Sequence, residues 1–133
     1  MSENKTLIKI SEASVIAVHA VLHMINSKEE SFAAKKMAED MKVSYNHLSK
    51  VLQRLARKKL LNTLRGPRGG YVLTDKGRNS SLSDILSAVE GETSYASCFS
   101  SGTCKRKNCQ LSSFLRTVNF AFEKLLAAKI KDL

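Results

Sequence analysis

Apolar residues recur every three or four positions in five stretches of the chain, the spacing that places side chains on one face of a helix. The predicted helices cover residues 11–25, 33–41, 44–59, 81–91 and 111–131. The first is apolar on almost every side, which indicates the central helix of the core. In the fourth, Ser83 is the predicted N-cap and Gly91 the predicted end.

Two short strands are predicted between the third and fourth helices. Residues 60–64 (LLNTL) and 71–74 (YVLT) flank the Pro- and Gly-containing turn RGPRGG, and residues 75–81 (DKGRNSS) are predicted to be a turn-rich connector. A helix, a tight turn at Lys42 and Val43, a second helix capped by Ser44 and a hairpin form a winged helix-turn-helix pattern. The predicted fold class is therefore mainly α with a small β-wing, followed by a long C-terminal dimerisation helix.

Basic residues are concentrated in the same part of the chain. Between Met41 and Thr74 there is no Asp or Glu, and this segment holds +8 of the formal net charge of +10, from Lys42, Lys50, Arg54, Arg57, Lys58, Lys59, Arg65 and Arg68. The second helix of a helix-turn-helix enters the major groove and meets base edges with its N-terminal residues, which here are Ser44, Tyr45, Asn46 and His47. An ordinary solvated helix face is the alternative. Charge, turn and hairpin together favour double-stranded DNA as the partner.

Length and composition favour one compact domain. The chain has 133 residues and 43% hydrophobic content, enough for one core. We expect a DNA-binding domain at 1–91, a cysteine-rich segment at 92–110 and a dimerisation helix at 111–133. Residues 1–10 show no secretory signal, and the longest apolar stretch, 13–25, is shorter than the roughly 20 residues of a membrane span. The chain is therefore predicted to be cytoplasmic, without a membrane partner.

The last predicted helix has more apolar surface than a small domain can cover. One stripe carries Leu111, Phe114, Leu115, Val118, Phe122, Leu125 and Leu126. At 1.5 Å rise per residue the helix would be roughly 30 Å long. A second copy of the chain is the predicted partner, because operator-binding helix-turn-helix domains generally work as two-fold dimers. An intrachain core helix is the alternative.

All three cysteines lie within twelve residues. Cys98, Cys104 and Cys109 have the spacing C-x5-C-x4-C, whereas a zinc ribbon or finger usually shows C-x2-C pairs and a fourth ligand. Thiolates suit iron-sulfur clusters, and the basic run 105–107 would offset the charge of an anionic cluster. Thiol-disulfide sensing without metal and three incidental cysteines are the alternatives.

The segments VSYNHLSKVLQRLARKKLL, LRGPRGGYVL and SLSDILSAVEG, followed by three cysteines, resemble the IscR/NsrR-type family of bacterial winged-helix transcription regulators. The resemblance covers nearly the whole chain, and RGPxGGY followed by DI-x-x-A-x-EG is its most specific part. It implies a homodimer whose iron-sulfur cluster lies near the other subunit's first helix and alters operator affinity. It assigns DNA contacts to Ser44, Tyr45, Asn46, His47, Lys50, Arg65 and Arg68, and cluster ligation to Cys98, Cys104 and Cys109.

The chain departs from the family pattern at the cluster. The last cysteine interval is one residue shorter than in better-known members, and Ser112 stands where IscR-like proteins have a histidine. The position of the acidic ligand of NsrR-like members falls at Val15. The cluster type, [2Fe-2S] or [4Fe-4S], therefore stays open. His19, one helical turn beyond Val15 on the same face, is the predicted fourth ligand, supplied by the partner subunit; a hydrogen-bonded interface histidine is the alternative.

The predicted function is that of a DNA-binding transcription regulator, a repressor, whose cluster senses redox state, iron or nitric oxide. One alternative is a cluster-free regulator controlled by a thiol switch or a partner protein. The other is an electron-transfer protein or enzyme. The sequence disfavours an enzyme because it shows no substrate motif, no paired acid and base, and no Gly-rich phosphate loop before a helix.

Overall fold

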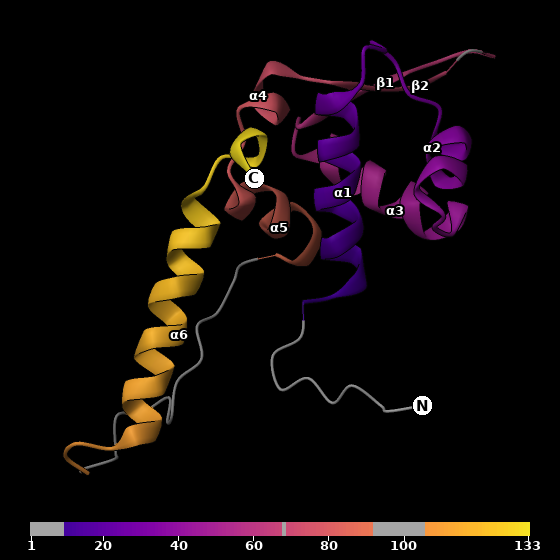
Figure 1. Cartoon of the computed structure of the whole chain (residues 1–133). Helices are drawn as coiled ribbons and strands as arrows, with labels where there is room; N and C mark the ends of the chain where they lie inside the picture. Colours follow the sequence, from indigo (N-terminus) through magenta and orange to yellow (C-terminus); the bar gives the residue numbers. More distant parts are fainter. Residues whose placement is uncertain (1–9, 68, 92–105) are drawn as a thin grey trace.

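The structure of the chain, a computed structural model, describes residues 10–67, 69–91 and 106–133 (Figure 1). Its elements are α1 (Glu12–Asn26), α2 (Ala34–Met41), α3 (Tyr45–Arg57), β1 (Leu61–Leu64), β2 (Gly70–Leu73), α4 (Asp75–Arg78), α5 (Leu82–Glu90), α6 (Gln110–Ala127) and the 3₁₀ turn η1 (Ile130–Asp132). β1 and β2 pair antiparallel, with Leu61 opposite Leu73. This helical fold with a two-stranded wing confirms the predicted fold class.

Helix α1 is the centre of the core, as its apolar pattern predicted. Ser11 caps it, because the Ser11 Oγ accepts a hydrogen bond of 3.1 Å from the Ser14 N–H. Ala17 and Ala20 are completely buried, and their small side chains let neighbouring helices approach α1 closely. Helices α3 and α5 pack against it.

Helix α3 has one buried and one uncovered face. Leu48, Val51, Leu52 and Leu55 are all completely buried. Burial of each such side chain contributes about 1.5–3 kcal/mol, so this stripe fixes the rotation of α3 about its axis. Rotation in turn decides which side chains of α3 are left for a partner.

Two sequence predictions between residues 74 and 84 are wrong. The N-cap of α5 is Ser81, not Ser83: the Ser81 Oγ accepts from the Asp84 N–H at 3.1 Å, and the Asp84 carboxylate accepts from the Ser81 N–H at 2.9 Å. The predicted connector contains the short helix α4, because the Thr74 Oγ1 caps it through the Gly77 N–H at 2.9 Å. Helix α5 therefore begins one residue before its predicted cap, and part of the predicted connector is helical.

The C-terminal helix is shorter than predicted and only its end joins the core. Helix α6 stops at Ala127, and η1 turns back so that Ile130 is completely buried and its N–H donates to the Ser80 carbonyl at 3.0 Å. Leu126 is also buried, whereas Leu111 and Phe114 at the other end are more than half exposed. Figure 1 shows α6 extending away from the other helices. The intrachain alternative therefore holds for the C-terminal end of the stripe only.

Candidate nucleic-acid interface

The turn between α2 and α3 has the geometry of a helix-turn-helix. Lys42 ends α2 in the left-handed conformation, with φ 57°, and the Val43 N–H donates to the Ala38 carbonyl at 3.0 Å. Ser44 then caps α3 by accepting a 3.4 Å hydrogen bond from the His47 N–H. The chain thus reverses within two residues, which brings the first turn of α3 to the surface.

Most of the residues predicted on α3 lie on its uncovered face. Ser44, Tyr45, Asn46 and Lys50 are exposed, with Tyr45 52% exposed. His47 is half-buried instead, and its Nδ1 lies 4.0 Å from a carboxylate oxygen of Glu12 in α1. The sequence grouped His47 with Ser44, Tyr45 and Asn46 but gave no sign of the contact with Glu12, because Glu12 is 35 residues away in the chain.

The wing is attached to the helical part through its second strand. Phe32 and Tyr71 form an isolated antiparallel bridge in which each backbone N–H donates to the other's carbonyl at 2.8 Å. Gly70 is required beside it, because a Cβ at that position would stand 2.3 Å from the Phe32 carbonyl oxygen. At the tip, Gly66 has φ 107° and Arg65 is exposed. Arg68 lies outside the described residues.

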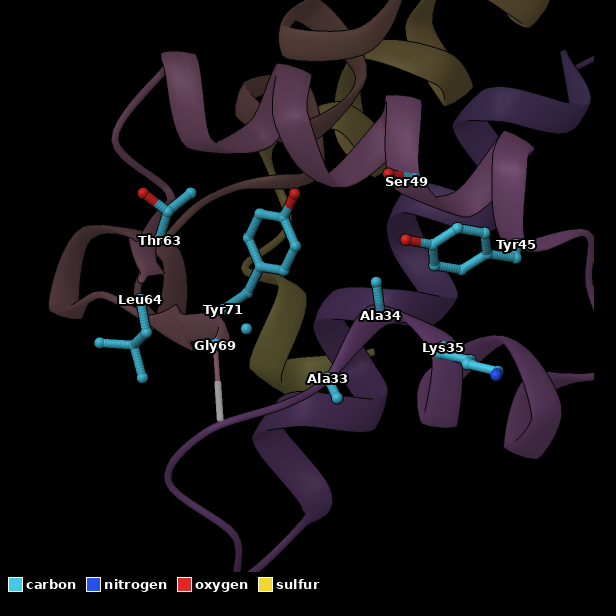
Figure 2. Close-up of a pocket in the computed structure, with 10 residues that line it drawn as sticks. Ala33, Ala34, Lys35, Tyr45, Ser49, Thr63, Leu64, Gly69 and Tyr71 are labelled. Carbon is cyan, nitrogen blue, oxygen red and sulfur yellow. The ribbon is translucent and has the colours of Figure 1, made fainter. Parts of the chain in front are cut away.

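A hollow of about 410 Å³ separates the recognition helix from the wing (Figure 2). The Tyr45 and Tyr71 rings stand on either side of it, and Ser49 of α3 and Lys35 of α2 also line it. Burial raises the pKa of Tyr71 above its ordinary value of 10.0, and the nearby Tyr45 adds to the rise. Tyr71 therefore keeps its hydroxyl proton and can donate a hydrogen bond at neutral pH.

Three lining residues were not among the predicted contacts. Lys35 belongs to the first helix of the motif, and Ser49 lies within the second helix, beyond its N-terminal residues. Tyr71 was predicted only as a strand residue. Since successive strand residues point to opposite faces, the strand pattern could have placed Tyr71 on one face of the hairpin, but not toward α3.

One of the basic residues of α3 points elsewhere. Arg54 donates a hydrogen bond from Nη1 to the carbonyl oxygen of Val89 in α5, at 3.1 Å. Arg54 is exposed, as are Lys50 and Arg57, one turn before and after it, but its guanidinium is directed to α5. The basic residues between Met41 and Thr74 therefore do not all belong to one DNA-facing surface.

The predicted cluster ligands are only partly within the described residues. Cys98 and Cys104 lie outside them. Cys109 is half-buried, is not in a disulfide and stands at the N-cap of α6. His19 is exposed on α1 and borders two hollows, an apolar one between α1, α5 and α6 and one that it shares with His23. In the described ranges, no three His, Cys, Asp or Glu side chains are placed to hold a metal ion.

The three thiols nevertheless form a donor set suited to iron-sulfur ligation. The one that the structure describes is unpaired, and exposed Arg106 and Lys107 precede it closely. Such cations would offset the negative charge of a cluster.

None of the described helices has the length and apolarity needed to cross a membrane.

Comparison with known protein families gives one match over almost the whole chain. A family model described as "Rrf2: Iron-dependent Transcriptional regulator" matches residues 10–133. The HTH-type transcriptional repressor NsrR of Streptomyces coelicolor is 32% identical over 102 residues, which are 76% of this chain and 69% of that protein. The HTH-type transcriptional regulator IscR of Escherichia coli is 28% identical over 90 residues, or 67% of this chain and 56% of that protein.

Solved structures show the same fold. CymR, described as the global cysteine regulator of B. subtilis, superposes with a TM-score of 0.76 at 20% identity, over 95% of both chains. IscR of T. potens gives a TM-score of 0.69 at 23% identity and covers 95% of this chain and 85% of its own. At such identities the likeness establishes the winged-helix architecture alone.

Proposed function

The chain belongs to the Rrf2 family of transcriptional regulators, and from this we propose that it is a homodimeric repressor whose operator affinity is controlled by an iron-sulfur cluster. Its named relatives are transcription regulators and not enzymes, which agrees with the absence of an enzyme motif in the sequence. The cluster would be held by Cys98, Cys104 and Cys109 and would sense redox state, iron or nitric oxide.

The observation that carries the DNA-binding part is the uncovered N-terminal half of α3 beside the wing. Tyr45, Asn46 and Lys50 are exposed on a helix whose opposite face is completely buried. A rigid helix of this kind can enter a major groove without rearrangement of the core. The exposed Arg65 then lies at the tip of a hairpin that the Phe32–Tyr71 bridge holds in place.

The interface residues divide by chemistry into two roles. The Asn46 amide offers a donor and an acceptor, the pair that matches the N6 and N7 positions of adenine. Lys50 and Arg65 neutralise phosphate charge, which supplies affinity but little sequence information. The Tyr71 and Ser49 hydroxyls can donate to phosphate oxygens that approach the hollow between α3 and the wing.

When bound, the cluster would supply a group whose charge and integrity change on oxidation, iron loss or reaction with nitric oxide. The protein's contribution is ligation by three thiolates, with a fourth ligand that we place at His19 of the partner subunit. His19 is exposed in the single chain, so its imidazole is open to a second copy. In the described part of the cysteine-rich segment, Arg106 and Lys107 provide compensating charge.

The dimer part of the proposal rests on α6. Leu111 and Phe114 are 56% and 58% exposed and lie on the same stripe as the half-buried Leu115 and Val118. Exposed apolar stripes of this kind on a projecting helix mark protein interfaces. A second α6 is the self-complementary partner that a two-fold dimer offers.

A cluster-free thiol switch is the second candidate. It is supported by the same three cysteines, since Cys109 is unpaired in the structure and could form a disulfide under oxidation. It requires no fourth ligand, and hence no role for His19. Cytoplasmic localisation is common to both candidates and remains a prediction.

The absorption spectrum of anaerobically purified protein, with iron and sulfide analysis, tests the cluster. We expect visible absorbance and stoichiometric iron and sulfide, both lost in Cys109→Ala. Colourless protein without iron, whose cysteines change reactivity on oxidation, would replace the cluster with the thiol switch. Gln110→Ala, at the exposed position next to Cys109, is the matched control and should retain iron.

A further inference from the structure

The C-terminal turn of α5 is joined to the recognition helix by one side chain. Val89 lies in the last turn of α5, where carbonyl groups have no helical donor. The Arg54 guanidinium supplies one, at 3.1 Å. A cation at this end of a helix also meets the negative end of the helix dipole, so the contact is favourable in charge as well as geometry.

The next residue joins the same turn to α1. The Glu90 carboxylate accepts a hydrogen bond from the Ser14 Oγ at 3.2 Å and a second from the Ser11 Oγ. Ser14 is only 2% exposed, whereas Glu90 is exposed, so the link runs from the buried face of α1 to the surface. Val89 and Glu90 thus connect α5 to the N-terminus of α1 and to the last turn of α3.

These two residues also stand just before the cysteine-rich segment. Helix α5 ends at Glu90, Gly91 follows, and Cys98 is eight residues beyond Glu90 in the sequence. Any rearrangement of the segment that reaches α5 through the chain must act first on this turn. The Arg54 contact then offers a direct path to α3, because Arg54 is one turn after Lys50 on the same helix.

We propose that Arg54 is a positioning residue that transmits the state of the cysteine-rich segment to the recognition helix through the Val89 carbonyl. This inference rests on the proposed function and adds the route of its regulation. It separates Arg54 from the other exposed cations of α3: its guanidinium has a hydrogen-bond partner in α5, and we assign the DNA-contacting charges to Lys50 and Arg57. Displacement of the α5 turn would shift α3 and change how Tyr45 and Asn46 meet the groove.

The test compares Arg54→Ala with Arg57→Ala, which removes the same charge from an exposed position three residues further along the same helix. Operator affinity is measured over a salt series for cluster-loaded and cluster-stripped dimer. In wild type and Arg57→Ala the two states should differ by about tenfold or more, within the usual range of allosteric coupling. Arg54→Ala should bring them within about twofold at an unchanged salt slope, because no phosphate contact is lost.

The inference would be overturned if Arg54→Ala lowered the salt slope by about one unit and kept the affinity ratio between cluster-loaded and cluster-stripped protein. That result would identify Arg54 as a phosphate contact. Arg54→Met, which keeps a long side chain but has no hydrogen-bond donor, should behave like Arg54→Ala. Circular dichroism of each variant establishes that it is folded.

Hydrogen exchange in the DNA-free protein separates this inference from the proposed function. Arg54→Ala should accelerate amide exchange in the last turn of α5, and Arg57→Ala should not. If wild-type protein bound no operator, or bound it equally with and without the cluster, the proposed function would be contradicted. The exchange result would still test the contact between Arg54 and the Val89 carbonyl. Equal exchange in Arg54→Ala and Arg57→Ala would overturn the inference about Arg54.

Discussion

Phe32 and Tyr71 exchange two backbone hydrogen bonds of 2.8 Å and so tie the wing to the residue that precedes the helix-turn-helix. The bridge adds a third extended segment beside the two-stranded hairpin, and a hairpin alone is marginally stable in water. The orientation of the wing relative to α3 therefore depends on this contact.

Substitution of Gly70 tests the bridge. The Cβ in Gly70→Ala would approach the Phe32 carbonyl oxygen to 2.3 Å, so one backbone segment must move. We expect a loss of about 1–3 kcal/mol in the free energy of unfolding, typical of overpacking. Urea denaturation measures it. Asn62→Ala, at an exposed position of β1, is the control, and equal stability of both variants would show that the wing adjusts freely.

Tyr71 should make stability fall at high pH. The folded-state pKa of Tyr71 is raised above 10.0. Its contribution to the free energy of unfolding is therefore complete below about pH 10 and decreases as the pH rises through the folded-state pKa. Tyr71→Phe should lose that part of the pH dependence, seen in urea denaturation between pH 9 and 11. Tyr45→Phe removes only the smaller cause of the raised pKa and should therefore reduce the pH dependence less than Tyr71→Phe does. Parallel curves for wild type and Tyr71→Phe would speak against the raised pKa.

Two substitutions separate phosphate binding from base recognition. Arg65→Ala should weaken operator binding and lower its salt slope by about one unit, whereas Asn46→Ala should relax sequence preference at one base pair by about 1–3 kcal/mol. Fluorescence anisotropy with operator and single-base variants measures both. Wild-type behaviour of both variants at physiological salt would mean that the recognition surface is misplaced.

The apolar stripe of α6 should hold the dimer together. Phe114→Glu combined with Val118→Glu places two charges on the stripe and should give monomer or aggregate in sedimentation velocity. Phe120→Glu is the control, because Phe120 is 62% exposed but lies on the opposite side of the helix at about 100° per residue. A stable, folded, monomeric wild type would refute the proposed interface.

The His19 assignment is tested by anaerobic reconstitution of His19→Ala and His19→Cys. If His19 of the partner subunit is a ligand, both variants should change the visible spectrum, and His19→Cys should lower the midpoint potential because thiolate replaces imidazole. His23→Ala, one turn further along α1, is the control. Unchanged spectrum and potential with full iron content would exclude His19 from coordination.

Local patterns were sufficient to predict most of the fold. The apolar stripe of α3, the cap at Ser44 and the turn at Lys42 depend on neighbours within a few residues, and each agrees with the structure. At α5 two serines lie near the helix start, and only the reciprocal bonds between Ser81 and Asp84 show which one caps it. Helix propensity alone does not decide between them.

The contacts between distant elements could not be predicted. Arg54 belongs to the basic run, but its bond to Val89 depends on the packing of α3 against α5, and a carbonyl acceptor has no signature in the sequence. The same holds for His47 beside Glu12 and for Tyr71 beside the recognition helix. These side chains acquire their surroundings only from the tertiary fold.

Operator binding by cluster-loaded and cluster-stripped protein shows whether the cluster controls DNA affinity. The operator is first selected from a pool of random duplexes, and both forms are then titrated anaerobically at the same salt concentration. We expect sequence-specific binding that changes by about tenfold or more on cluster loss, and a Cys109→Ala variant that binds like the stripped form. Equal affinity of the two forms, or binding without sequence preference, would contradict it.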